Sequence, residues 1–386
     1  MIIHSYKTWL NLLTVSLFLV SCVSESQEHN AQKEASPKEY SDISSIKESC
    51  CPDKRTTIFD IEVNGENMEG ETSSEEGFIQ LSLLAKDRGL NNEITLLPKE
   101  DIEHEFGLIS VSVAHLRGEA KHSSELVSQG LLGHPIRILK KEDNWYKVQL
   151  VDGYLGWMDK KSFVFTTADE KVSWENGAKS FILEKNVELT NTKGEVIYEL
   201  VAGNIVLNDS NNPDMVILPD GKKGFLKGTS KLSKSQWTKM ALSGEEIVSD
   251  AKQYLGIPYL WGGASSKGYD CSGLTKTVFL LNGIQLPRDA SQQVFCGEEI
   301  APGERFTNLQ AGDLLFFGKK ATQEKKEKVT HVAIYMNNGE MIHATGHVKI
   351  QSLLEDSPLF AEDRLKTFLR AKRISKDCIG DYSHRL

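Results

Sequence analysis

One stretch decides the fold, and it reads AKQYLGIPYLWGGASSKGYDCSGLTKTV over residues 251–278. Its start continues an apolar pattern with the three- to four-residue spacing of an amphipathic helix, which Gly256 and Pro258 are expected to end. A glycine-rich loop follows, and Asp270 then stands where a helix N-cap belongs, directly before Cys271. We therefore expect Cys271 in the first turn of a helix, where the helix dipole lowers a thiol pKa and favours the reactive thiolate.

Two histidines downstream make that cysteine a candidate nucleophile. An Asn-Asn-Gly turn predicts a hairpin, with His331 near the start of one strand and His343 near the end of its partner. A Cys on a helix, a His on a strand and a polar group on the next strand form a nucleophile, a base and an orienting residue. Each of them alone is more often structural, since a free Cys commonly packs as a small hydrophobe. Together they favour catalysis. The expected buried strands are 312–317, 329–336 and 340–344.

Six motifs in this part of the chain belong together as a set: PYLWGG (258–263), YDCSGL (269–274), PRD (287–289), AGDL (311–314), THV (330–332) and IHA (342–344). Through them, residues 244–374 resemble the NlpC-type cell-wall cysteine peptidases, which have a minimal papain-like fold. The resemblance implies Cys271 as nucleophile, His331 as general base and His343 as the third catalytic member. It also implies five residues that line the substrate groove: Tyr259, Trp261, Asp270, Ser272 and Asp289.

Short strands separated by turns dominate residues 108–168, which predicts a small barrel. The segment resembles a bacterial SH3-like domain through VAHLR (113–117), SELVSQ (124–129) and GYLGW (153–157). Residues 169–236 look like a second, weaker copy that lacks the aromatic pair, so a structural role is expected for it. In cell-wall peptidases that combine such barrels with an NlpC-type domain, a Glu and a Tyr of the barrel close one end of the groove. By motif position these are Glu125 and Tyr154; the alternative is an exposed Glu, a Tyr at the core edge and an open groove.

The N-terminal part of the chain reads as an export signal and a linker. Residues 1–22 combine Lys7 with an apolar run too short to span a bilayer, and they end in the lipobox-like sequence LVSC, whose Cys22 would be lipidated. The alternative is a signal peptide with an incidental Cys. Residues 23–54 are polar and fit a disordered tether. Residues 55–107 form a cap region of open role, with a helix expected over 75–87.

Charge and cysteine usage limit the possible partners. The net charge of −9 with no basic run argues against nucleic acid as a partner. The sequence shows no metal-ligand spacing, and we expect neither a metal nor another cofactor. Disulfides are compatible with export, although a bridge between two adjacent cysteines would be strained. Four cysteines allow three pairings, which stay open: Cys50, Cys51, Cys296 and Cys378.

These expectations combine into one reading of the chain. It has an α+β papain-like catalytic domain over residues 242–376, preceded by two all-β SH3-like barrels, and it is exported and lipid-anchored to a bacterial membrane. The resemblance implies cleavage of the γ-D-glutamyl to diamino-acid bond in peptidoglycan stem peptides with a free N-terminal L-Ala, as in wall recycling. Two alternatives stay open: a wall-peptide-binding lipoprotein with an inactive enzyme domain, and an acyltransferase on the same fold. The preferred diamino acid, the membrane that holds the anchor and the oligomeric state are also open.

Overall fold

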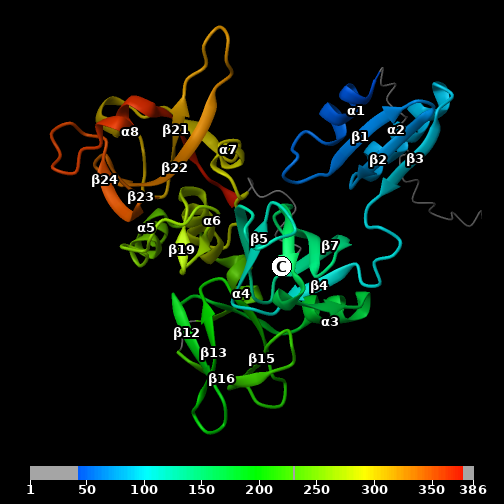
Figure 1. The fold of residues 1–386 in the computed structure, drawn as a ribbon. Helices are drawn as coiled ribbons and strands as arrows, with labels where there is room; N and C mark the ends of the chain where they lie inside the picture. The colour runs from blue at the N-terminus through cyan, green and yellow to red at the C-terminus, as the bar shows by residue number, and fades with distance from the viewer. Residues whose placement is uncertain (1–41, 229–230, 377–386) are drawn as a thin grey trace, which may run out of the picture. The chain divides into compact units, whose positions relative to one another are not determined.

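The computed structural model describes residues 42–228 and 231–376 (Figure 1). The predicted signal segment with Cys22, the first part of the predicted tether, and Cys378 lie outside the described residues. Within the described ranges, every helix is too short or too polar to cross a lipid bilayer. The same residues contain no cluster of three or more His, Cys, Asp or Glu side chains placed to hold a metal ion.

The N-terminal region is a small α/β unit rather than the end of a tether. The tether predicted for residues 23–54 is wrong from residue 42 onward, because Asp42 caps a helix whose Ile46 is fully buried. The average composition there is polar, but Ile43, Ile46 and Cys50 share one helix face and pack on the helix 75–87, which forms as predicted. Strand β2 pairs antiparallel with β1 and parallel with β3. The elements are α1 (Ile43–Cys50), β1 (Phe59–Asn64), β2 (Asn67–Thr72), α2 (Glu75–Asp87) and β3 (Asn91–Leu96).

The first predicted barrel is a seven-stranded antiparallel sheet with strand order β10-β4-β7-β8-β9-β5-β6. Alternate side chains of its strands, among them Leu116, Ile138 and Val148, are fully buried in one core. Strands β4 and β5 follow one another closely in the chain but pair with different neighbours, β4 with β7 and β5 with β6. The strands are β4 (Phe106–Ile109), β5 (Val113–Arg117), β6 (Leu126–Leu131), β7 (Pro135–Glu142), β8 (Trp145–Leu150), β9 (Leu155–Asp159) and β10 (Phe163–Thr166).

A second seven-stranded sheet follows, with strand order β13-β12-β16-β15-β14-β11-β17. Helix α3 (Ala168–Asn176) precedes it, and α4 (Lys234–Lys239) joins it to the next domain. Trp237 of α4 is fully buried, stacks on Phe181 of this sheet and donates its indole N–H to the Leu280 carbonyl. The strands are β11 (Lys179–Ile182), β12 (Asn186–Thr190), β13 (Val196–Val201), β14 (Ile205–Asn208), β15 (Met215–Ile217), β16 (Lys223–Lys227) and β17 (Lys231–Ser233).

The C-terminal domain, yellow-green to red in Figure 1, is α+β as predicted. Its antiparallel sheet has the order β20-β25-β21-β22-β23-β24, and helices α5 and α6 cover one face through Phe316, Val332 and Ile334. The expected β22–β23 hairpin forms, with Asn338 and Gly339 both at positive φ. The helix before the glycine-rich loop ends at Lys252, earlier than predicted. The elements are α5 (Gly244–Lys252), β18 (Ala264–Ser265), β19 (Gly268–Tyr269), α6 (Cys271–Leu281), α7 (Ala290–Gln293), β20 (Glu298–Ile300), β21 (Leu314–Lys319), β22 (Lys328–Asn337), β23 (Glu340–Thr345), β24 (His347–Ser352), α8 (Glu362–Thr367) and β25 (Phe368–Arg373).

Candidate active site

Cys271 is the first residue of α6, as its sequence context predicts. Asp270 is the N-cap, and its Oδ1 accepts the backbone N–H of Gly273 at 2.7 Å. The helix start lies against the glycine-rich loop so closely that a Cβ at position 273 would clash with the Gly263 carbonyl oxygen. This close approach explains why the YDCSGL motif contains a glycine after the nucleophile. Cys271 as a whole residue is 8% exposed.

A chain of three side chains runs from β22 across β23 to β24. Nε2 of His331 lies 2.7 Å from Nδ1 of His343, and Nε2 of His343 lies 2.8 Å from Oε1 of Gln351. Because Oε1 only accepts, His343 donates from Nε2, and its Nδ1 is then the acceptor for the N–H at Nε2 of His331. Neutral His331 therefore carries its proton on Nε2, which leaves Nδ1 as the basic nitrogen. This tautomer leaves His331 with an unprotonated Nδ1, as the role of general base predicted for it would need.

Burial controls the charge states of Cys271, His331 and His343. It raises the pKa of Cys271 to about 11, and the nearby Asp270 carboxylate acts in the same direction. Burial also lowers the pKa of His331 well below its ordinary value and that of His343 to about 4. The expectation of a lowered thiol pKa is thus wrong for the unliganded protein, because loss of water around the thiol outweighs the helix N-terminus and the Val332 N–H that stabilise a thiolate. The resting pair is a thiol and a neutral imidazole.

A groove of about 380 Å³ opens beside the Cys271 thiol. Lys328, Val329 and Thr330, which directly precede His331 on β22, form part of its wall. His331 and His343 are buried and are not among the residues that line it. All seven residues that the sequence analysis assigned to the substrate line this groove: Glu125, Tyr154, Tyr259, Trp261, Asp270, Ser272 and Asp289.

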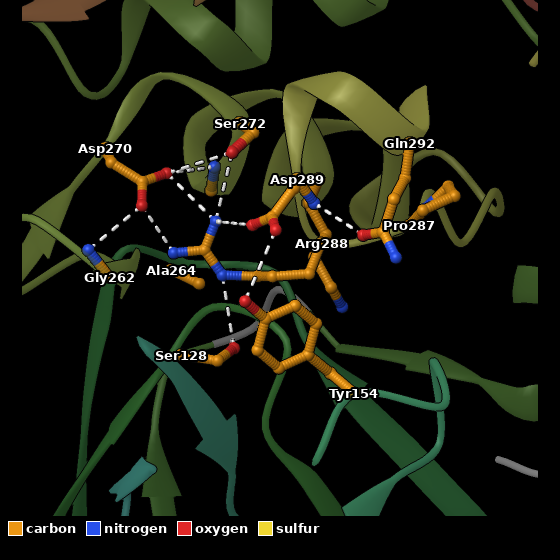
Figure 2. A network of polar contacts seen from close by, with 12 residues as sticks. Ser128, Tyr154, Gly262, Ala264, Asp270, Ser272, Pro287, Arg288, Asp289 and Gln292 are labelled. Carbon is orange, nitrogen blue, oxygen red and sulfur yellow. Dashed lines mark hydrogen bonds and ion pairs between the residues drawn. The ribbon is translucent and has the colours of Figure 1, made fainter. Parts of the chain in front are cut away.

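Asp270 and Ser272 of this set take part in a buried network of polar contacts (Figure 2). The guanidinium of Arg288, 1% exposed, contacts both Asp270 oxygens at 3.0 and 2.5 Å and the Ser272 hydroxyl at 3.0 Å. The second Asp270 oxygen also accepts the Gly262 N–H at 3.0 Å. Every strong acceptor site of Asp270 is therefore occupied, so this carboxylate holds the loop and the helix start together. Sequence reasoning missed Arg288, although it lies inside the PRD motif.

The first barrel reaches the groove through polar contacts. The indole N–H of Trp261, a side chain 63% exposed, donates to Oε1 of Glu125 at 2.7 Å. The Tyr154 hydroxyl donates to Oδ2 of Asp289 at 3.3 Å (Figure 2). Burial, together with the charge of Asp289, raises the pKa of Tyr154, so this hydroxyl stays protonated. The structure therefore brings Glu125 and Tyr154 of the barrel to the same groove as Cys271.

Gln351 is the other residue of the site that sequence reasoning missed. It lies on β24, where Lys349 is the direct cross-strand partner of His343 and Gln351 is that of Met341. Gln351 is thus the diagonal neighbour of His343, a distance that a Gln side chain can span. A search for polar residues diagonal to His343 would have found Gln351, but such a search requires the pairing register of β23 and β24, which the sequence does not give.

Two parts of the chain match known protein families. Residues 256–363 match the NlpC/P60 family, and residues 116–163 match the bacterial dipeptidyl-peptidase Sh3 domain. The first range contains Cys271, His331, His343 and Gln351, and the second contains Glu125 and Tyr154. Both parts of the groove therefore fall inside matched segments.

Curated relatives and a solved structure agree with these matches. Dipeptidyl-peptidase 6 of Lysinibacillus sphaericus is 30% identical over 277 residues, covering 67% of this chain and 96% of that relative. A gamma-D-glutamyl-L-lysine dipeptidyl-peptidase of Bacillus cereus is 28% identical over 276 residues, covering 65% of this chain and 76% of that relative. A crystal structure of an NlpC/P60 family protein from Bacillus cereus superposes with a TM-score of 0.58 at 24% identity, covering 69% of this chain and 99% of that one, which shows the shared fold.

Proposed function

The chain belongs to the NlpC/P60 family of cysteine peptidases that act on peptidoglycan peptides, and we propose that it cleaves stem peptides with a free N-terminal L-Ala. The bond cut is the one between the γ-carboxyl of D-glutamate and the diamino acid. Gamma-D-glutamyl-L-lysine dipeptidyl-peptidases are among its relatives, which supports this bond. Such a specificity suits the degradation of released wall fragments, as in recycling, better than that of intact wall.

The mechanism begins with proton transfer from the Cys271 thiol to Nδ1 of His331. The thiolate attacks the γ-carbonyl carbon of the substrate, and the backbone N–H of Cys271 at the start of α6 stabilises the oxyanion. Burial raises the pKa of Tyr259 to about 12, so its hydroxyl stays protonated and serves as a second donor. The His331 imidazolium then protonates the leaving amine of the diamino acid. Water, deprotonated by the same imidazole, hydrolyses the acyl-enzyme.

One observation carries the proposed preference for a free amine: two barrel residues and Asp289 line the groove of the catalytic domain. The Glu125 carboxylate, held by Trp261, and the Asp289 carboxylate, held by Tyr154, both line the groove and give it two acidic groups. An ammonium group binds there with opposite charges nearby, whereas a buried ammonium without a partner costs several kcal/mol. An N-acetyl group or a glycan has no charge to offer these carboxylates and needs more room.

The test compares a free stem tripeptide with the same peptide N-acetylated, and identifies the products by mass spectrometry. We expect release of the L-Ala-γ-D-Glu dipeptide and a preference of at least about 100-fold for the free amine in kcat/KM, which corresponds to ~2.7 kcal/mol. Glu125→Gln should reduce that preference. Glu119→Gln is the matched control, because Glu119 is an exposed residue of the same β5–β6 connection and pairs with Lys121. Equal rates on both peptides would contradict the proposed amine recognition.

We further propose that the protein is exported and anchored to a bacterial membrane by lipid on Cys22. The lipobox-like LVSC sequence supports the anchor. A wall substrate makes an extracytoplasmic location useful, since stem peptides are released there.

A further inference from the structure

A side chain of the N-terminal region contacts two residues that line the groove, although this region lies outside both segments that match known families. The segment around Arg55 is attached to the first barrel. The Leu155 N–H donates to the Arg55 carbonyl at 2.8 Å, and the Gln149 side chain donates to the Thr56 carbonyl at 2.8 Å. These two bonds place Arg55 next to Tyr154, which lies in the β8–β9 connection and contacts Asp289 of the catalytic domain.

The Arg55 side chain crosses from the barrel to the catalytic domain. Its Nη1 donates to Oδ2 of Asp289 at 2.8 Å and to the hydroxyl of Ser291 at 2.7 Å. Asp289 thereby receives both the Tyr154 hydroxyl and the Arg55 guanidinium on the same oxygen. Ser291 and Asp289 both line the groove. The carboxylate that we assign to the substrate amine is therefore held by a residue from the N-terminal region.

The Arg55 guanidinium also binds a second carboxylate, that of Asp53. Nε and Nη2 of the guanidinium contact the Asp53 carboxylate at 2.8 and 2.7 Å, and the Gln292 side chain donates to the same carboxylate at 2.8 Å. Although burial acts in the opposite direction, these hydrogen bonds hold the pKa of Asp53 below its ordinary value, so it is ionised. Two carboxylates against one guanidinium leave one net negative charge. Asp53 thus offsets the charge that Arg55 brings to Asp289.

We propose that Asp53 and Arg55 form a charge-compensated clamp on Asp289, through which the N-terminal region sets the affinity of the groove for the substrate's terminal ammonium. Arg55 is a positioning residue in this arrangement: it fixes the carboxylate without touching the scissile bond. Without Asp53, its positive charge would repel the ammonium that Asp289 binds. The inference rests on the proposed function, since it concerns the same amine.

The compensation of the Arg55 charge by Asp53 can be tested with one variant that removes it and a second that restores the net charge. Asp53→Asn leaves Arg55 in place but uncompensated, so we expect KM for the free-amine tripeptide to rise by about 3- to 10-fold, the range of a partly buried charge contact. We expect kcat on this peptide, and the slow rate on the N-acetylated peptide, to change less than twofold. The double variant Asp53→Asn/Arg55→Gln restores one net negative charge but loses the contact that fixes Asp289, so KM should fall between that of Asp53→Asn and that of wild type.

The KM of the double variant distinguishes the proposed clamp from a contact that only stabilises the fold. If the pair only held the regions together, the double variant would lose more than Asp53→Asn in both activity and thermal stability. Asp60→Asn is the matched control, because it makes the same charge change at an exposed position of the N-terminal region and should leave KM unchanged. Dissociation constants of the L-Ala-γ-D-Glu dipeptide, with and without an N-acetyl group, provide a readout that does not depend on turnover.

The possible results also distinguish this inference from the proposed function. If the wild-type protein cleaves free and acetylated peptides equally well, amine recognition fails, and the clamp fails with it. If the wild type prefers the free amine and Asp53→Asn keeps both the preference and KM, only the clamp is overturned.

Discussion

Oε1 of Gln351 lies 2.8 Å from Nε2 of His343, and through the contact between the two imidazoles it determines the proton positions of both His343 and His331. We expect Gln351→Leu to lower kcat/KM by about 5- to 10-fold, the worth of one buried hydrogen bond, because His343 then loses the acceptor that selects its tautomer. Gln351→Glu keeps an acceptor at this position and should retain most activity at neutral pH. Equal losses in both variants would contradict the assigned proton positions.

The nucleophile can be tested against a second cysteine of the same domain. Cys271→Ala should abolish hydrolysis with little effect on the unfolding midpoint, since Ala suits the first turn of α6. His331→Ala should cost as much as Cys271→Ala, and the double variant little more, because the two act as one catalytic unit. Cys296→Ala is the control and should remain active. Activity that survives in Cys271→Ala but not in Cys296→Ala would show that the nucleophile is misassigned.

The pH dependence of kcat/KM follows from the shifted pKa values of His331 and Cys271. The active pair of Cys271 and His331 shares one proton, so activity is lost when a second proton binds at low pH or when the last one leaves at high pH. Burial lowers the pKa of His331, which places the acid limb of kcat/KM below pH 6.5. Burial raises that of Cys271 to about 11, which moves the alkaline limb up.

Deprotonation of the substrate's α-amino group should add a further decline of kcat/KM at alkaline pH. An α-amino group titrates near 7.7–8.0, so kcat/KM for the free tripeptide should fall above about pH 8. The slower hydrolysis of the N-acetylated peptide should continue unchanged to about pH 9. Rate profiles of both peptides check this, and identical alkaline limbs would argue against an ionised amine in the bound substrate.

Arg288 supports the site through stability rather than chemistry. Arg288→Met should destabilise the protein by about 3–5 kcal/mol, because it leaves the Asp270 carboxylate buried without its cation. Arg288→Lys keeps the charge but loses the two-oxygen contact, and should lie between wild type and Arg288→Met. Urea unfolding of the three proteins measures the difference. A loss below about 1 kcal/mol in Arg288→Met would contradict a buried ion pair.

The membrane anchor gives a prediction that is independent of the site. Cys22 should carry lipid in the mature protein, and Cys22→Ser should release the protein or leave its signal uncleaved. Cell fractionation and mass spectrometry of the mature N-terminus measure both outcomes. Stable attachment requires two or more acyl chains. Wild-type protein recovered wholly in the soluble fraction, with an unmodified N-terminus, would rule the anchor out.

The sequence alone was sufficient for the catalytic elements, because they follow from local rules. Asp270 before an apolar-periodic run predicts a helix start at Cys271, and an Asn-Asn-Gly turn predicts the hairpin that joins His331 to His343. The helix over residues 75–87 was predicted in the same way, from spacing and a glycine after its end.

Only the tertiary structure decided the features that depend on distant parts of the chain. The pKa of Cys271 is set by burial, which a local pattern does not contain, so the sequence predicted the wrong direction. The role of Gln351 depends on strand register, and that of Arg55 on a contact across 234 positions of the chain. Local periodicity reports which element a residue forms, whereas the charge and partners of its side chain depend on what the folded chain brings beside it.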